Sequence, residues 1–339
     1  MVDWRGPLGD VGLTHDEVGE WRDRVVLVTG AAGLLGRSIT RELVARGANV
    51  VGLDLAWVAR RPPSEASLTA VPGDVRDRSA TEALLRRERV DTVIHLAAQT
   101  LVGPALEAPA ETFSHNVEGT WALLEACRVQ GSVQRIVVAS SDKAYGDAGG
   151  RPYKEEMALR PRHPYDTSKA MADLLAQTYA HTYGLPVAIT RCANLFGGGD
   201  LNWSRIVPGT IRSVVRDERP VIRSDGTFLR DYLFVRDAAI GALVLADAVG
   251  RRPEVRGEAF NFAAGHRLTA LEMVRRILRV MRSPLEPTIL AAPLREVPVQ
   301  RVSALRARRE LGWQPRVTLT DGLRQTVDWY RSYLETSAS

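Results

Sequence analysis

A glycine-rich turn between an apolar run and a helical pattern constrains the fold of this chain more than any other feature. Residues 25–29 form a short apolar run that predicts a buried strand, and a helical pattern continues from the turn to Arg46. The turn itself contains Gly30, Gly33 and Gly36. Glycine lets backbone amides approach a phosphate closely, and the dipole of the following helix favours an anion there. The sequence therefore predicts a strand–turn–helix unit that binds the pyrophosphate of a dinucleotide.

Strand and helix patterns alternate over the first 194 residues, after which the strands become short. Further strands are predicted at 49–54, 91–95, 135–139, 186–191 and 258–262, and helices near 79–88, 108–130, 164–183, 237–249, 303–310 and 319–333. This alternation predicts an α/β fold with a doubly wound parallel (Rossmann) sheet and a smaller, interleaved C-terminal α+β substrate domain.

The change of pattern after Asn194 suggests where the domains begin and end. Thr14 and Glu17 have capping-box spacing, which predicts a short helix ahead of the first strand. The predicted division is an N-terminal extension at 1–20, a dinucleotide-binding Rossmann domain at 21–194 to which 236–264 return, and a substrate-binding domain at 195–235 and 265–335.

Composition excludes several classes of function. Hydrophobic residues make up 45% of the chain and charged residues 25%, as in ordinary globular proteins. The net charge is +5, but the arginines are scattered among acids, so we expect no nucleic-acid partner. No apolar run reaches the roughly 18 residues of a membrane span, and the first 20 residues lack the apolar core of a secretory signal.

The two cysteines indicate a reducing compartment. Cys127 lies in a predicted helix and Cys192 in a predicted strand, so we expect two free core thiols and a cytoplasmic protein. The Cys and His residues show no metal-ligand spacing, and we predict no metal site.

A carboxylate at the end of the second predicted strand points to the cofactor. Asp54 lies 18 residues after Gly36, where it can accept hydrogen bonds from both ribose hydroxyls and repel a 2′-phosphate. This position favours NAD over NADP, although Arg60 and Arg61 would suit the phosphate of NADP. Asp74, together with Val75, is expected to face the adenine.

Lysine is rare here, and its positions indicate chemistry. Only three lysines occur among 45 basic residues, and Lys143 and Lys169 each stand in a short polar run. Lysine can lose its proton when buried, whereas arginine stays charged. Tyr165 lies four residues before Lys169, so the two share one helix face. An ammonium group beside a phenol lowers the phenol pKa, which would prepare Tyr165 to take a proton from a hydroxyl.

At this point the chain resembles the extended short-chain dehydrogenase/reductase family. The motifs that carry the resemblance are the glycine turn at 29–36, His95–Ala98, Asn116–Thr120, Ser140 with Ser141, Tyr165 with Lys169, and Leu311–Pro315. The resemblance covers about residues 22 to 335 and implies an NAD-binding domain, a nucleotide-sugar domain and a homodimer. The predicted cofactor contacts are Gly30, Gly33, Leu34, Leu35, Gly36, Asp54, Asp74, Val75, Leu96, Ala97, Ala98, Tyr165 and Lys169.

The pair Asp142-Lys143 distinguishes reactions within that family. It resembles the pair of nucleotide-sugar 4,6-dehydratases, and its Asp-Lys form is similar to that of the CDP-glucose enzymes. The resemblance implies that C4 oxidation acidifies the C5 proton, which a neutral Lys143 removes, while a protonated Asp142 protonates the departing C6 hydroxyl. Ser141 would hydrogen-bond the C4 oxygen. The predicted substrate contacts are Gln99, Ser141, Asn194, Val207 and Arg230, the last holding the pyrophosphate.

Other functions stay open at this stage. A nucleotide-sugar 4-epimerase would share Ser141, Tyr165 and Lys169 but would not need Asp142-Lys143. A uronic acid decarboxylase would also begin with C4 oxidation. A cofactor-sensing protein on the same fold would be expected to lose Tyr165 or Lys169. The nucleotide of the substrate (CDP, GDP, UDP or TDP) is not specified by these motifs, and product mass separates the reactions.

Overall fold

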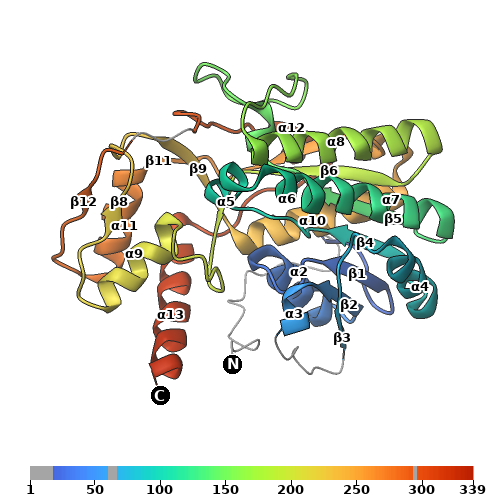
Figure 1. Ribbon diagram of the computed structural model, residues 1–339, viewed down its shortest axis with the longest axis horizontal. Coiled ribbons are helices and arrows are strands. Elements are labelled where there is room, and N and C mark those ends of the chain that lie inside the picture. Colours follow the sequence, from blue (N-terminus) through green and yellow to red (C-terminus); the bar gives the residue numbers. More distant parts are fainter. Residues whose placement is uncertain (1–17, 60–66, 293–295, 339) are drawn as a thin grey trace.

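A seven-stranded, wholly parallel sheet forms the centre of the computed structural model, which describes residues 18–59, 67–292 and 296–338 (Figure 1). The strands lie in the order β10-β6-β5-β4-β1-β2-β3. Their bounds are β1 Val25–Thr29, β2 Asn49–Asp54, β3 Leu68–Pro72, β4 Thr92–His95, β5 Arg135–Ala139, β6 Val187–Cys192 and β10 Ala259–Phe262. The chain winds outward from β1 in both directions, which confirms the doubly wound sheet that the sequence predicted.

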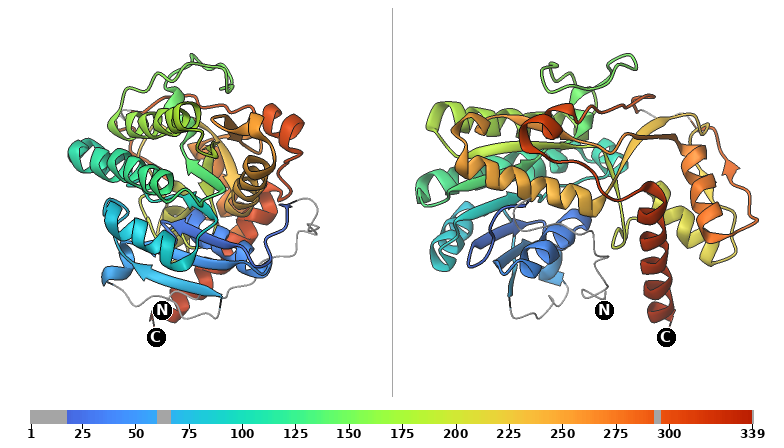
Figure 2. Two further views of the ribbon diagram at one scale, coloured as in Figure 1. Left: turned by 90° about the vertical axis from the view of Figure 1, so that its right-hand side faces the viewer. Right: turned by 180° about the vertical axis from the view of Figure 1, so that it is seen from behind.

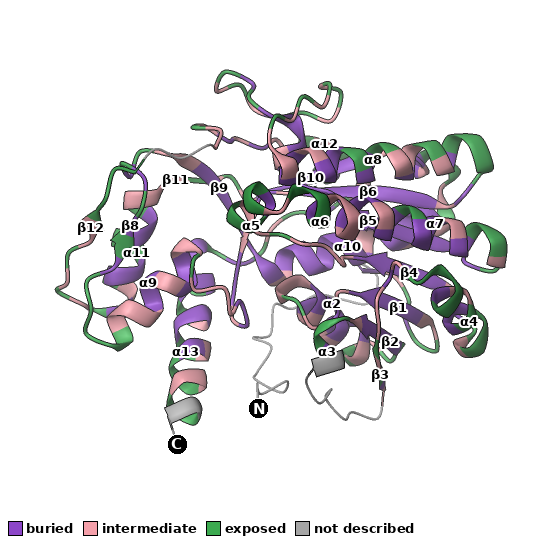
Figure 3. Ribbon diagram, viewed as in Figure 1, coloured by how far each residue is buried: buried purple, intermediate pink, exposed green. Residues whose placement is uncertain are grey.

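Helices cover both faces of this sheet. One face carries α2 (Leu34–Ala45), α10 (Val235–Arg251) and α12 (Leu305–Leu311), and the other carries α4 (Arg78–Glu88), α7 (Gly119–Gln130) and α8 (Pro164–Tyr183). Each face has its own apolar cluster: Ile39 and Leu243 belong to the first, and Leu85 and Leu123 to the second. The strands and the inner sides of the helices are accordingly buried, while the outer sides face solvent (Figure 3).

The long helix predicted at 108–130 is instead interrupted. It consists of α6 (Pro109–Phe113), a π-helical segment η1 (Ser114–Glu118) and α7, preceded by α5 (Val102–Glu107). Within η1, the Asn116 side chain accepts a hydrogen bond from the Gln99 backbone at 2.7 Å and donates one to Ser168 Oγ at 2.8 Å. These tertiary contacts account for the π-helical turn, a feature that is frequent near functional sites.

A second group of elements lies at one end of the large sheet (Figures 1 and 2). It contains a three-stranded sheet, a two-stranded sheet and three helices. These are β7 (Asn194–Phe196), β9 (Leu229–Phe234), β11 (His266–Thr269), β8 (Val221–Ile222), β12 (Thr288–Ile289), α9 (Ile206–Val215), α11 (Ala270–Met281) and α13 (Leu319–Ala338). Short segments complete the chain: α3 (Ala56–Ala59), the 3-10 helix η2 (Asp142–Tyr145) and η3 (Pro253–Val255). The division into domains at the predicted boundaries remains a proposal.

Residues just ahead of β1 are packed into the core. Val18 and Trp21 are 1% and 2% exposed, and the Trp21 indole donates a hydrogen bond to the Val18 carbonyl at 2.9 Å. The helix predicted from Thr14 and Glu17 lies outside the described residues. Among the helices that are described, none has both the length and the apolarity required to cross a membrane.

Candidate active site

The glycine turn has the shape of a cradle that a side chain would fill. Gly30 has a φ of +69°, a conformation that favours glycine, and helix α2 begins directly after Gly33. A Cβ atom built on Gly36 would lie 2.2 Å from the Gly30 carbonyl oxygen. Leu34 and Leu35 are half-buried in the first turn of α2. The amides of the first turn of α2, which have no carbonyl partner within the helix, fit the pyrophosphate of a dinucleotide.

Asp54 ties the end of β2 to this turn. Its Oδ2 accepts a hydrogen bond from the Ala32 amide at 2.8 Å, and its Oδ1 accepts one from the Ala56 amide at 2.8 Å. The carboxylate therefore stands beside the cradle, as the ribose-binding prediction requires. Arg60 and Arg61 lie outside the described residues.

Thr29 brings the predicted cofactor segment after β4 against the glycine turn. Its Oγ1 accepts hydrogen bonds from the Leu96 and Ala97 amides at 3.2 Å each and lies 2.7 Å from His95 Nδ1. A Cβ atom on Gly30 would meet the Ala97 amide nitrogen at 2.8 Å. Leu96, Ala97 and Ala98 are all half-buried, so this segment forms the second wall of the cradle.

Asp74 and Val75 are largely engaged with the protein. Arg76 donates to both oxygens of Asp74, from Nε at 3.1 and 3.0 Å, and this contact lowers the pKa of the Asp74 carboxyl despite its burial. Val75 is 7% exposed and packs beside Gly119 of α7. The expected contact of Asp74 with an adenine would compete with Arg76.

The predicted catalytic groups meet where η2 packs against α8. Ser141 caps η2: its Oγ accepts a hydrogen bond from the Lys143 amide at 3.2 Å and donates one to Asp142 Oδ1 at 3.2 Å. Asp142 is 2% exposed, and its Oδ2 has no hydrogen-bond partner among the described residues. Burial raises the pKa of Asp142 more than Lys143 and Arg230 lower it. The direction of this pKa shift is the one that a general acid requires.

Tyr165 and Lys169 are both buried on one side of α8, as predicted. Lys169 Nζ donates a hydrogen bond to the Ala139 carbonyl at 2.8 Å, and burial lowers its pKa to about 8. Burial raises the pKa of Tyr165 to about 12, and a hydrogen bond with Ser141 is the largest opposing influence. The expected lowering of the phenol pKa by Lys169 is therefore not found: burial is the largest influence on Tyr165, and the groups that oppose it are Ser141 and Arg205.

Lys143 faces a carboxylate that sequence reasoning missed. Its Nζ lies 3.9 Å from Glu296 Oε2 and 3.5 Å from Gln300 Oε1, and Arg230 Nη2 lies 2.8 Å from the same Glu296 oxygen. Burial alone would raise the pKa of Glu296, but Lys143 and Arg230 lower it below its usual value. Glu296 thus joins the catalytic run to Arg230, which is itself 8% exposed.

The predicted substrate contacts have different surroundings. Asn194 begins β7 and its buried Nδ2 has no hydrogen-bond partner among the described residues, which suits a ligand contact. The Gln99 amide folds back on its own loop and donates to Leu101 O and to Thr112 Oγ1 at 3.0 and 3.2 Å. Val207 is 4% exposed and belongs to the core beneath α9.

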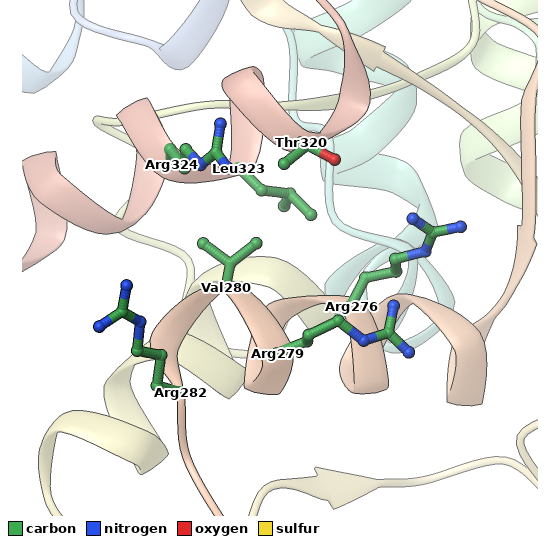
Figure 4. Close-up of a pocket in the computed structure, with 7 residues that line it drawn as sticks. All are labelled: Arg276, Arg279, Val280, Arg282, Thr320, Leu323 and Arg324. Atoms are coloured by element: carbon green, nitrogen blue, oxygen red, sulfur yellow. The ribbon is translucent and has the colours of Figure 1, made fainter.

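A separate open pocket lies between α11 and α13 (Figure 4). Its lining residues are Arg276, Arg279, Val280, Arg282, Thr320, Leu323 and Arg324. None of the predicted catalytic, cofactor or substrate residues takes part in it.

These features match a known family. A model of the NAD dependent epimerase/dehydratase family matches residues 26–263, and the chain therefore belongs to this family. Its cofactor is NAD, as predicted, and the glycine cradle and Asp54 fit that cofactor.

The proteins similar to this chain include both 4,6-dehydratases and epimerases. It is 33% identical to the dTDP-glucose 4,6-dehydratase of Xanthomonas campestris pv. campestris over 329 residues, which cover 90% of this chain and 92% of the relative. An epimerase from Methanothermobacter thermautotrophicus superposes with a TM-score of 0.87 at 27% identity, covering 95% and 96% of the two chains. The dTDP-glucose 4,6-dehydratase of Streptomyces venezuelae, solved with NAD bound, has a TM-score of 0.82 at 29% identity, covering 92% and 98%.

Proposed function

We propose that this protein is an NAD-dependent nucleotide-sugar 4,6-dehydratase, which converts a nucleotide-diphosphate hexose to its 4-keto-6-deoxy form. The observation that carries the proposal is the pair Asp142-Lys143 beside Tyr165. Asp142 is 2% exposed and its pKa is raised by burial, so it can arrive at the reaction with a proton. A 4-epimerase has no step that uses such an acid.

The first step oxidises the sugar at C4. NAD supplies the hydride acceptor at C4 and afterwards the hydride donor at C6. Tyr165 must be in its phenolate form to take the proton of the C4 hydroxyl, and Ser141, which hydrogen-bonds Tyr165, orients the C4 oxygen. Lys169 lies one helical turn away on the same helix and would balance the negative charge of the phenolate before it accepts this proton.

The second step removes water across C5 and C6. The C4 ketone acidifies the C5 proton, which Lys143 takes in its neutral form. The C6 hydroxyl leaves as water with the proton of Asp142. The C5 proton joins the exchangeable ammonium hydrogens of Lys143, one of which returns to C5 once C6 has been reduced. Glu296 and Gln300 position the Lys143 ammonium at 3.9 and 3.5 Å.

The remaining contacts would hold the substrate. We infer that Arg230 binds the diphosphate and Asn194 offers its free amide to the nucleotide sugar. The curated relatives are named for dTDP-glucose and UDP-glucose, so the nucleotide is to be found by assay. Incubation with the CDP-, GDP-, UDP- and TDP-hexoses followed by product mass would identify it. We also propose that the protein works in the cytoplasm as a homodimer.

Replacement of Lys143 by methionine tests the reaction. Lys143→Met should keep NAD binding and C4 oxidation but lower water loss by a factor of about 10²–10⁴, the usual contribution of a general base. Lys143→Arg should fail as well, because a guanidinium does not give up its proton. The measurement is C5 deuterium exchange from heavy water together with product mass. Lys154→Met is the matched control, because the Lys154 side chain is 58% exposed.

Tyr165→Phe should instead stop the first oxidation. If Lys143→Met exchanges and dehydrates normally, Lys143 has only a structural role. If the unmutated protein returns a product of unchanged mass, the 4-epimerase alternative replaces the dehydratase. Two epimerase structures, with TM-scores of 0.87 and 0.83, support that alternative.

A further inference from the structure

The pocket between α11 and α13 takes no part in the reaction proposed above (Figure 4). It has a volume of about 230 Å³, and four of the seven residues that line it are arginines: Arg276, Arg279, Arg282 and Arg324. Val280 and Leu323 supply its apolar part, and Leu323 is fully buried. In Figure 4 these two side chains point toward each other from the two helices. The pocket thus combines an apolar base with a cationic rim.

Neighbours on the same helix do not neutralise this rim. Three of its arginines have no carboxylate within ion-pair distance in the part of the chain that the structure describes: Arg276, Arg279 and Arg282. On other helices such partners are present. Arg128 of α7 pairs with Glu125 at 2.6 Å, and Arg306 of α12 pairs with Glu310 at 3.0 Å. The positive charge at the pocket is therefore available to a ligand.

Two acids that precede these arginines are already engaged. Glu272 lies one turn before Arg276, but its carboxylate accepts hydrogen bonds from the amide and the hydroxyl of Thr269, at 2.7 and 2.9 Å, in the capping box of α11. Asp321 lies 3.0 Å from Arg324 and pairs with that guanidinium. Neither carboxylate serves the three arginines of α11.

Helix polarity explains only part of this cluster. The C-terminal end of a helix favours cations, and Arg279 lies in the last turn of α11, with Arg282 as its C-cap residue. This effect does not account for Arg324, which α13 contributes. Arg276 and Arg279 are three residues apart and therefore neighbours on the helix surface, where like charges repel. A bound anion would remove this repulsion.

We propose that this pocket binds an anion with two or more linked phosphate groups, which belongs to a nucleotide or to an inorganic oligophosphate. A guanidinium binds phosphate oxygens through paired, charge-assisted hydrogen bonds. A phosphate chain carries such oxygens on successive centres, so one ligand can contact arginines of both helices. The site is distinct from the one at Arg230, and the inference does not depend on the dehydratase function.

Hydrogen exchange measured by mass spectrometry tests the site, because it reports where a ligand binds. The whole protein is compared with and without millimolar inorganic triphosphate. Peptides that cover 270–285 and 319–328 should exchange more slowly when triphosphate is present. This protection should weaken as salt is added, because salt screens exposed charges. Peptides around Arg230 report any binding in the candidate active site separately.

A double variant tests the role of the arginines. In Arg279→Gln with Arg282→Gln, the triphosphate concentration that gives half of the protection should rise by a factor of about 10, the scale of two exposed charge pairs. Both side chains are exposed, so the thermal transition should not change. Arg86→Gln with Arg87→Gln is the matched control, because these arginines end α4 and do not line the pocket. This control should keep the full protection.

Comparison of ligands identifies the source of the phosphate chain. Tighter binding of dTTP than of inorganic triphosphate indicates a nucleotide, and otherwise the inorganic chain is the ligand. If citrate protects the same peptides equally well, the pocket selects charge alone and the proposal is wrong. It is also wrong if triphosphate protects only peptides around Arg230 or none, or if the double variant keeps the protection. Vesicles containing phosphatidylserine that protect these peptides where triphosphate does not would indicate a membrane contact instead.

Discussion

Arg191 and Asp173 form a buried ion pair behind the catalytic run. Their side chains are 4% and 0% exposed, with Nε and Oδ2 2.8 Å apart and Nη2 and Oδ1 3.0 Å apart. Arg191 also donates to the Tyr145 hydroxyl at 2.8 Å and lies over its ring at 4.9 Å. Because Tyr145 ends η2, the pair supports the segment that carries Asp142 and Lys143.

Removal of one member of this pair should be costly. Asp173→Asn leaves the Arg191 charge buried without its partner, so the free energy of unfolding should fall by about 3–5 kcal/mol. Urea denaturation followed by circular dichroism measures the loss. Asp321→Asn removes an exposed partner of Arg324 and should cost less than about 1 kcal/mol. Equal losses of unfolding free energy in the two variants would mean that the buried Arg191–Asp173 pair stabilises the fold no more than the exposed pair does.

Among the individual site residues, those whose motif spacing places them together could be predicted from the sequence. Tyr165 and Lys169 were predictable because a spacing of four residues fixes a common helix face. Glu296 was not, because it reaches Lys143 from a distant segment with no fixed spacing. The burial of Asp166, which is 5% exposed in the first turn of α8, was not predictable either, because an acid at that position is common at the surface.

Helices α7 and α8 lie side by side on one face of the sheet (Figure 1). Both helices expose apolar side chains. Trp121, Met171 and Leu174 are 50%, 42% and 53% exposed. Leu124 of α7, in contrast, is fully buried against the sheet, and Leu175 of α8 is partly buried in the same cluster. The exposed side chains remain the candidates for a dimer contact.

Disruption of this apolar surface should give a monomer. Trp121→Lys with Leu174→Glu places charges where two copies would bury apolar area, so light scattering should report half the mass of the unmutated protein. Leu305→Glu is the control, since Leu305 is 68% exposed on α12, away from this pair of helices. An unmutated protein that is already monomeric at micromolar concentration would contradict the dimer.

The helices and strands differ in how well the sequence predicted them. Strands β1, β2 and β5 were found at the expected residues because apolar runs bounded by turn residues are local signals. The π-helical turn at 114–118 carries no such signal, because it depends on contacts of Asn116 with Gln99 and Ser168. Tertiary contacts of this kind override the local helical pattern.

At the scale of the whole molecule, the chain leaves the large sheet, enters the smaller group of elements and then returns to the sheet, which joins the two parts. After β7 the chain builds part of the smaller group of elements and then returns through α10 and β10. Helix α10 packs against α2, β5 and β6, and Phe260 and Phe262 of β10 are fully buried. The alternating pattern predicted this return, whereas the place of β10 at the sheet edge beside β6 needed the structure.

A chain that stops at residue 194 should therefore not fold alone. Without α10 and β10, the apolar face beneath them, which includes Ile39 and Val137, would be open to water. Such a fragment should lack a cooperative thermal transition by circular dichroism, whereas the full chain should show one. A sharp transition in the fragment would show that residues 1–194 form an independent unit.

Glu296 gives the site its own internal counter-ion. One oxygen of its carboxylate serves both Arg230, at 2.8 Å, and Lys143, at 3.9 Å. A diphosphate that binds Arg230 must therefore exchange with this carboxylate instead of adding to an unpaired cation. The binding free energy measured for such a ligand is the difference between two interactions of the Arg230 guanidinium, one with the diphosphate and one with Glu296. Selectivity among anions would then depend on how well each fits the fork of Arg230, and total negative charge would count for less.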